Sequence, residues 1–451
     1  MRSLSPLLAL LVLLLLTPIA SLADAQGLIE ALQECPNTLT AGSQPEQIHL
    51  QTTPDPSEMT VVWATDGRTD AEVEWTSGSS SGAVMGESYC YGQQDMAFHL
   101  ATMTGLPLGA EISYHVGDGN TWSDDHTFTT IDPTANRFEW IAIADHGMSE
   151  EGLQVSDALI ADGEAQMVTI SGDISYANGD QSMWDDYFDI QQASMVGIPW
   201  MTAVGNHEDE TGRGFEAYEH RLDADGVVEV EPFWYSRDVP GVHLVFMSTE
   251  HAFDSSSSQY GWLASDLASV DRALTPFVVV LGHKPMYSSN SYHGSEVDLR
   301  DALEALYVEH GVDLVIAGHD HFYERTWPVI DGEVIETAQD SRFVKGAAPI
   351  HLVIGIAGRD TYEELDEPQP EWSAYRENST YGWTRLVYDG EAAELSLTHH
   401  RIDGTIGDQF VIMQSAPPDE PESLLPGFDP ILPLLAIIGA AFRRPQHSPD
   451  A

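Results

Sequence analysis

From Arg137 onward, short apolar runs alternate with segments of helical periodicity. A run that is apolar at every position predicts a strand buried on both faces, and such strands occur in sheets covered by helices. Residues 137–415 are therefore predicted to form an α/β domain. The apolar runs are 138–144, 166–171, 200–204, 243–248, 277–282 and 313–318, and the helical segments are 152–163, 182–194, 261–270 and 297–311. Two later stretches, 350–358 and 394–412, are predicted to be hairpin strands of a second sheet.

Residues 44–131 have a different pattern, in which short β-rich runs are separated by Gly, Ser, Asp and Pro. This spacing is typical of a small β-sandwich. Nothing in the segment indicates catalysis. Residues 131–136 are expected to link it to the α/β domain.

Polar side chains follow the apolar runs where the predicted strands end. Ligands of α/β proteins bind beyond the C-terminal ends of strands. A Gly-Asp pair alone usually marks a turn, but here five polar clusters meet at one edge of one domain, and four of them begin with glycine, which permits a tight turn and a close ligand. The residues in these clusters are Asp145, Asp173, Tyr176, Asn206, His207, His283, His319 and His321.

This set of side chains predicts a metal centre. Oxygen and nitrogen donors without a thiolate suit Fe, Zn or Mn. Six or seven donors are too many for one zinc ion, and they match two metals that share a bridging carboxylate. Because residues two apart on a strand point the same way, His319 and His321 can each bind a different metal of the pair.

The five clusters read "ADHG", "GDISY", "GNHE", "GHKP" and "GHDH", and in this order they resemble the calcineurin-like metallophosphoesterases. Tyr176 in "GDISY" narrows the resemblance to the purple acid phosphatases. The stretches "MYSSNSYHGSE", "WSAYRE" and "HRIDG" are also similar to that family, so the likeness covers about residues 44–415. It implies a four-layer αββα sandwich preceded by a small fibronectin III-like β-sandwich. One departure is Ala144, where the family usually has glycine, and we expect it to do little harm.

The resemblance implies a ligand set in three parts. The ligands of a ferric ion would be Asp145, Tyr176 and His321. The ligand that bridges the two metals would be Asp173. The ligands of the second metal, a divalent Fe, Zn or Mn, would be Asn206, His283 and His319.

The reaction that the resemblance implies is hydrolysis of phosphate monoesters at acidic pH by attack of a metal-bound hydroxide. His207 and His293 would contact the phosphate and supply protons, and the sequence leaves open which of them protonates the leaving group. Two alternatives compete with this function. One is a phosphodiesterase or nucleotide hydrolase on the same scaffold. The other is a non-catalytic surface binding protein in which the β-sandwich is the active part.

The charge of the chain limits its partners. It has 72 acidic against 18 basic residues, a net charge of −54. Such a surface repels nucleic acid and anionic membranes, so we expect a small phosphorylated substrate and no nucleic-acid binding. The acidity is typical of a salt-adapted source, although a merely acidic secreted protein would fit as well.

The first 25 residues are predicted to be a secretory signal peptide. They combine a basic start, the apolar run Leu7–Leu16 and the small-residue site Ala23-Asp24-Ala25. The run is too short to span a membrane. An exported chain would meet an oxidising compartment, so Cys35 and Cys90 are expected to form a disulfide, two unpaired thiols being the alternative.

The last segment, 416–451, has a polar spacer, the apolar run Ile431–Phe442 and two arginines. It resembles the PGF-CTERM tail of archaeal surface proteins, a sorting signal that is replaced by a lipid anchor, with Pro426-Gly427-Phe428 as the signature. A helix that docks on the protein itself is the alternative, but arginines behind an apolar run favour the membrane. We therefore expect an exported, extracytoplasmic protein anchored at the cell surface, with membrane contact only through this tail or its lipid replacement.

Overall fold

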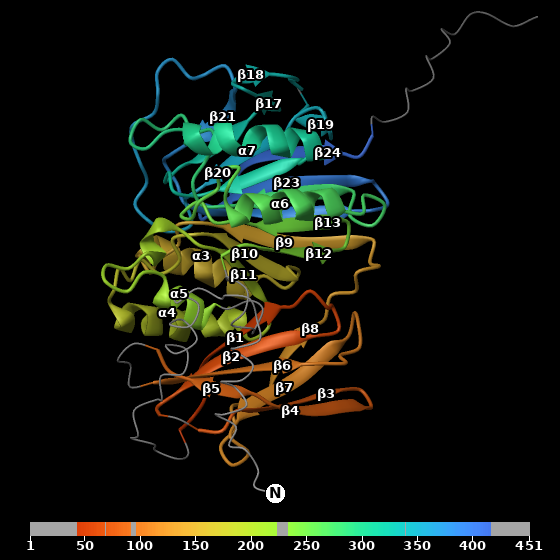
Figure 1. Ribbon diagram of the computed structural model, residues 1–451, viewed down its shortest axis with the longest axis vertical. Coiled ribbons are helices and arrows are strands. Elements are labelled where there is room, and N and C mark those ends of the chain that lie inside the picture. The colour runs from red at the N-terminus through yellow and green to blue at the C-terminus, as the bar shows by residue number, and fades with distance from the viewer. Residues whose placement is uncertain (1–42, 68, 92–95, 223–232, 339, 416–451) are drawn as a thin grey trace, which may run out of the picture. The chain divides into compact units, whose positions relative to one another are not determined.

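The computed structural model describes residues 43–67, 69–91, 96–222, 233–338 and 340–415 (Figure 1). The chain divides into two compact units, Met1–Ser415 and Ala416–Ala451, and the architecture below belongs to the first. The predicted signal peptide and C-terminal tail lie outside the described residues. Within the described residues, no helix has the length and apolar character needed to cross a membrane.

The N-terminal region contains two four-stranded antiparallel sheets. The strands of one are β1 (Glu46–Thr52), β2 (Met59–Thr65), β6 (Ala97–Met103) and β5 (Glu87–Tyr89), in that order. The strands of the other are β4 (Ser80–Met85), β3 (Glu72–Ser77), β7 (Glu111–Gly117) and β8 (His126–Thr129). Alternating side chains of both sheets, such as Trp63 and Tyr114, share one buried core. The predicted all-β N-terminal domain is confirmed, whereas its fibronectin type stays a prediction.

Two seven-stranded sheets form the described part of the α/β region. The first has the order β11 (Trp200–Ala203), β10 (Met167–Ser171), β9 (Arg137–Ile143), β22 (Gly382–Asp389), β23 (Glu394–Arg401), β24 (Ile406–Met413) and β19 (Arg342–Val344). The second has the order β12 (Tyr235–Val239), β13 (Val242–Phe246), β14 (Phe277–Leu281), β15 (Leu314–Ala317), β20 (Ile350–Ile354), β16 (Tyr323–Thr326) and β21 (Ser373–Glu377). A small pair, β17 (Val329–Ile330) and β18 (Glu333–Val334), stands apart.

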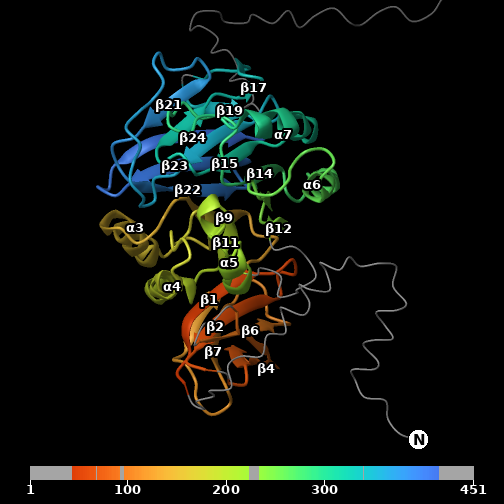
Figure 2. The same ribbon diagram turned by 60° about the vertical axis from the view of Figure 1, so that its left-hand side comes forward.

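The α-helices of the described residues are α3 (Glu150–Ala161), α4 (Gln181–Met195), α5 (Glu216–Arg221), α6 (Ser258–Ser269) and α7 (Val297–His310). They cover the outer faces of the two sheets (Figures 1 and 2). In β9, Ile141 and Ile143 pack with residues of α3 and α4, whereas Trp140 and Ala142 join the core between the sheets. In β14, Val278 and Val280 pack with α6 and α7, and the alternate residues face the inner core. The predicted four-layer αββα sandwich is thus confirmed.

The predicted sheet membership was partly wrong. The stretch 394–412 does form an antiparallel hairpin, β23 with β24. It extends the first sheet, however, because β22 pairs with both β9 and β23. Strand β20 is not part of that hairpin and lies parallel to β15 in the second sheet. These pairings join residues far apart in the chain, which local periodicity does not encode.

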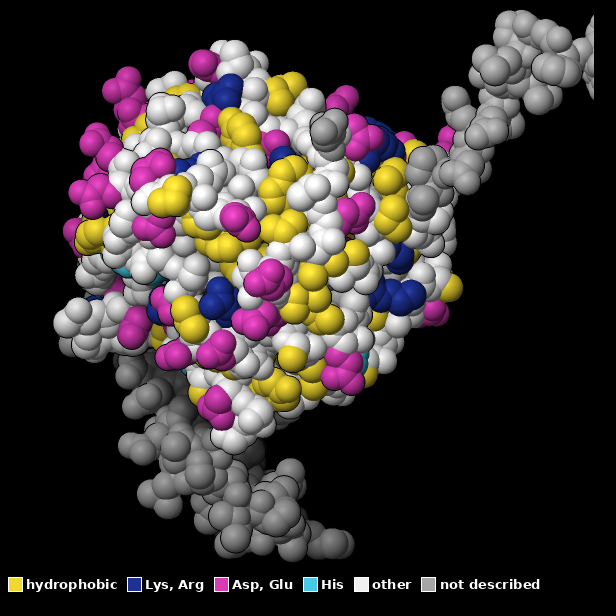
Figure 3. All heavy atoms as spheres, turned by 90° about the horizontal axis from the view of Figure 1, so that it is seen from above, with side chains coloured by type: hydrophobic (Ala, Val, Ile, Leu, Met, Phe, Trp, Pro, Cys, Tyr) yellow, Lys and Arg dark blue, Asp and Glu magenta, His cyan; other side chains and the backbone are white. Residues whose placement is uncertain are grey.

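Cys90 is in a disulfide, and the described residues include no free cysteine. Cys35, its predicted partner, lies outside the described residues. Acidic side chains are spread over the face seen in Figure 3, with few basic ones among them. The predicted acidic surface is therefore visible on this face.

Candidate metal centre

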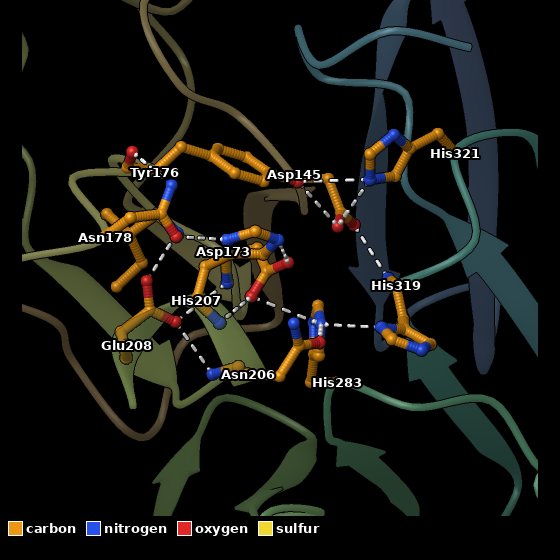
Figure 4. Close-up of polar contacts among 12 residues, drawn as sticks. Asp145, Asp173, Tyr176, Asn178, Asn206, His207, Glu208, His283, His319 and His321 are labelled. Atoms are coloured by element: carbon orange, nitrogen blue, oxygen red, sulfur yellow. Dashed lines mark hydrogen bonds and ion pairs between the residues drawn. The ribbon is translucent and has the colours of Figure 1, made fainter. Parts of the chain in front are cut away.

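The polar residues at the strand ends come together at the carboxyl edges of both sheets (Figure 4). Each predicted ligand follows a parallel strand or its turn. The first sheet supplies Asp145 after β9, Asp173 and Tyr176 after β10, and Asn206 after β11, at the start of the 3-10 turn η1 (Asn206–Glu208). The second sheet supplies His283 after β14, and His319 and His321 after β15.

One group of contacts joins Asp145, Tyr176 and His321. The Tyr176 hydroxyl donates to Asp145 Oδ1 at 3.0 Å and lies 3.1 Å from His321 Nε2. His321 Nε2 is 3.4 Å from the same Asp145 oxygen. Three donor atoms thus surround one point, as ligands of a single cation do.

A second group centres on His283. Its Nε2 lies 3.1 Å from Asn206 Oδ1, 3.2 Å from His319 Nδ1 and 3.3 Å from Asp173 Oδ1. Donor atoms of Asp145, Asp173 and His283 all lie within 4.8 Å of one another. Asp173 therefore stands between the two groups, where a carboxylate could touch two cations.

The backbone at these positions is strained. Asp145, Asp173, Tyr176 and His319 have φ angles of 56°, 54°, 55° and 69°. This left-handed conformation costs a non-glycine residue about 1–2 kcal/mol. Strain of this kind persists where the surrounding structure enforces it, and it clusters at functional sites.

The glycines that begin the clusters allow close approach. A Cβ atom at Gly205 would overlap Asp173 Oδ1, and one at Gly318 would overlap Asp145 Oδ2. The Cβ of Ala144 would also be only 2.6 Å from a side chain at Gly318. Ala144 is thus tolerated because its neighbour across the site has no side chain.

The two buried carboxylates favour positive charge at this point. Burial disfavours a charge on His283, but Asp173 outweighs it and raises the pKa of His283 to about 10. Burial also opposes ionisation of Asp173, yet His283 and His207 hold its pKa below the ordinary value. Burial and the charge of His283 lower the pKa of His319 to about 2, so this imidazole is a neutral donor. A neutral imidazole beside buried carboxylates is an environment that suits a borderline cation, and such a cation would take the place of the proton on His283.

The two predicted phosphate-binding histidines lie beside this cluster. The backbone N–H of His207 donates to Asp173 Oδ1 at 2.9 Å, and its Nδ1 lies 2.5 Å from Asn178 Oδ1. The ring of His293 is exposed and lies 4.2 Å from that of His319. Both imidazoles therefore border the cluster from the solvent side. His146, to which we assign no role, is fully buried and contacts the Tyr187 hydroxyl.

Glu208 and Tyr362 are among the residues at the site that sequence reasoning missed. Glu208 is fully buried and accepts the backbone N–H groups of Asp173, Ile174 and Gly205 at 2.8–2.9 Å. The ring of Tyr362 stacks on His321 at 4.3 Å. A carboxylate in the tight turn "GNHE" was a signal for the first, whereas Tyr362 follows no strand end and gave none.

Comparison with known families agrees with this geometry. The family described as "Calcineurin-like phosphoesterase" matches residues 123–323. "Purple acid Phosphatase, N-terminal domain" matches residues 45–130, and "Iron/zinc purple acid phosphatase-like protein C" matches residues 348–409. Together the three matches span both sheets of the α/β region and the β region before it.

Individual proteins match over most of their length. "Acid phosphatase type 7" of Danio rerio is 29% identical over 82% of this chain and 89% of its own. "Purple acid phosphatase 18" of Arabidopsis thaliana is 30% identical over 80% of this chain and 82% of its own. The structure of purple acid phosphatase PPD1 from yellow lupin seeds has a TM-score of 0.76 at 23% identity, covering 82% of this chain and 74% of its own. That structure has the same fold.

Proposed function

We propose that this chain, which belongs to the purple acid phosphatase family, is an exported enzyme that hydrolyses small phosphate monoesters at a centre of two metals. Metal-dependent acid phosphatase activity follows from the family. The export, the substrates and the residue roles are our proposal. The observation that supports it most strongly is the position of Asp173 between two groups of donors.

We assign a ferric ion to Asp145, Tyr176 and His321, and a divalent Fe, Zn or Mn to Asn206, His283 and His319, with Asp173 shared. Such a metal pair, when bound, supplies Lewis acidity and an acidified water as nucleophile. Burial, together with Asp145 and Asp173, raises the pKa of the Tyr176 phenol well above its usual value. Only a strongly acidic cation would ionise this phenol, which favours ferric iron on the tyrosine side.

The chain's own groups would complete the reaction. His207 is held through Nδ1 by Asn178, and its Nε2 lies 3.8 Å from Asp173 Oδ2, beside the centre, where it could also donate to a phosphate oxygen. His293 Nε2 lies 3.4 Å from the Tyr362 hydroxyl, which orients it. One of these imidazoles would donate a proton to the leaving alkoxide while both hold the phosphoryl oxygens.

Replacing these histidines tests the assignment. His293→Ala and His207→Ala should each lower kcat for a phosphate monoester by about 10²–10⁴-fold, because a general acid and an oxyanion contact are lost. Metal content should stay unchanged. His310→Ala is a matched control, because α7 ends where β15 begins, at the opposite edge of the sheet. Assays on a monoester, a diester and a nucleotide measure the effect. Loss of metal from either variant, or a preference for the diester, would contradict the proposal.

One observation among the described residues supports the proposal that the protein is exported. The disulfide of Cys90 is typical of an oxidising compartment. The signal peptide over 1–25 and the surface anchor over 416–451 remain proposals from the sequence. We also expect a small phosphorylated substrate rather than nucleic acid, since the net charge of −54 repels polyanions.

A further inference from the structure

Arg359 is held beside the metal centre by the backbone on both sides of it. Its N–H donates to the Asp145 carbonyl at 3.0 Å. The carbonyl of the next residue, Asp360, lies 2.6 Å from His321 Nδ1. Two residues assigned to the ferric site thus fix this segment, and the position of Arg359 relative to the centre is set by the fold.

The side chain of Arg359 reaches over the centre's tyrosine. Its Cζ lies 4.8 Å from the centroid of the Tyr176 ring, and that ring lies 4.5 Å from the ring of His207. Tyr176 is only 5% exposed, whereas Arg359 is exposed. The guanidinium is therefore on the solvent side of the ligands, next to a predicted phosphate contact.

This guanidinium makes no hydrogen bond or ion pair with any residue that the structure describes. That is unusual in a chain with 72 acidic and 18 basic residues. Most of the other described basic side chains are paired with an acid, as Arg325 is with Asp408 and Lys284 with Glu250. Arg359 keeps its five N–H donors available for an anion from solution.

We propose that Arg359 binds a second anionic group of the substrate, a carboxylate or a further phosphate, beside the phosphoryl group that is cleaved. This inference rests on the proposed function and specifies its preferred substrates as phosphorylated compounds with two anionic groups, either a monoester with a carboxylate or a diphosphate. In the proposed function, the metal pair and the imidazoles of His207 and His293 would already hold the reacting phosphoryl group. The planar guanidinium fork on the solvent side matches carboxylate or phosphate oxygens with two parallel hydrogen bonds.

The test compares Arg359→Gln with the wild-type, metal-loaded chain on three substrates. Phenyl phosphate has one anionic group, phosphoenolpyruvate adds a carboxylate and diphosphate adds a phosphate. In Arg359→Gln, the ratio of kcat/KM for either two-anion substrate to that for phenyl phosphate should fall about tenfold or more. Loss for phosphoenolpyruvate alone would identify a carboxylate site, and loss for diphosphate alone a phosphate site. The kcat/KM ratios of Arg359→Lys should lie between those of the wild type and Arg359→Gln, because lysine keeps the positive charge but lacks the planar fork of N–H donors.

Arg300→Gln is the matched control. Arg300 is on α7. Its guanidinium also lies over a tyrosine ring, with Cζ 4.9 Å from the centroid of the Tyr287 ring. Its removal changes the net charge equally and should leave the substrate ratios unchanged. The proposal would be overturned if the kcat/KM ratios of Arg359→Gln equal those of the wild type. The ratios also stay equal when kcat/KM falls by the same factor for all three substrates. An equal fall would instead place Arg359 on the reacting phosphoryl group.

A binding measurement separates this inference from the proposed function. Calorimetry with 3-phosphonopropionate, which carries a carboxylate, and with methylphosphonate needs no turnover. The preference for the first ligand should fall about tenfold in Arg359→Gln. If the wild-type chain hydrolyses none of the three substrates but shows this loss, the proposed function fails and the second-anion site stands. If the preference is unchanged, the second-anion site fails whatever the activity.

Discussion

Asp173→Asn is expected to lose both metals and to lower phosphatase activity on the order of a thousandfold or more. Asp173 stands between the two donor groups. Its Oδ1 lies 3.3 Å from His283 Nε2, and donor atoms of Asp145, Asp173 and His283 all lie within 4.8 Å of one another. An asparagine has nearly the same shape but offers one neutral acceptor oxygen, so it cannot bridge two cations with negative charge. The same change also removes the carboxylate that raises the pKa of His283.

Elemental analysis of the purified variant, with its melting temperature and its kcat for a phosphate monoester, measures the effect. Asp157→Asn is the matched control because Asp157 is exposed on α3, away from the strand ends. This control should keep both metals and its activity. An Asp173→Asn variant that retains two metals and most of its activity would show that this carboxylate is no bridge.

Glu208→Ala is expected to lower the free energy of unfolding by about 3–5 kcal/mol and to abolish most activity. Three backbone N–H groups donate to this carboxylate, from Asp173, Ile174 and Gly205, at 2.8–2.9 Å. Glu208 is fully buried, so alanine would leave these donors without acceptors. Because Asp173 is itself in a strained conformation at φ 54°, losing the contact should also release it from its position.

Chemical denaturation and metal analysis measure both parts of this effect. Glu208→Gln is the matched variant, because glutamine keeps the shape and one acceptor oxygen. Its free energy of unfolding should lie between those of the wild type and Glu208→Ala. A loss below about 1 kcal/mol with unchanged metal content would mean that Glu208 is replaceable and has no positioning role.

Much of the candidate metal centre could be predicted because its residues follow a local rule. Asp145, Asp173 and His283 each come two positions after the last residue of a buried parallel strand, and parallel strands end at the same edge of a sheet. A single sequence is enough to apply this rule. The glycines before the ligands were informative for the same reason, since their close approaches are local turns.

Other features depend on contacts that the sequence does not reveal. Strand β22 alternates buried and half-exposed residues, and nothing local indicates that it joins β9 to the hairpin β23–β24. Tyr362 and Arg359 lie in an irregular segment after β20, and only the fold brings them onto His321 and Tyr176. The strain at Asp145 and Asp173 is likewise imposed by tertiary structure, because neither residue type requires a positive φ.

Metal analysis together with visible spectroscopy of the purified chain is the most direct test of the central claim, that side chains from five strand ends hold two cations. We predict two metal ions per chain, at least one of them iron, and a visible absorption band that Tyr176→Phe removes. One metal or none, or two metals without iron and without the band, would contradict the assignment.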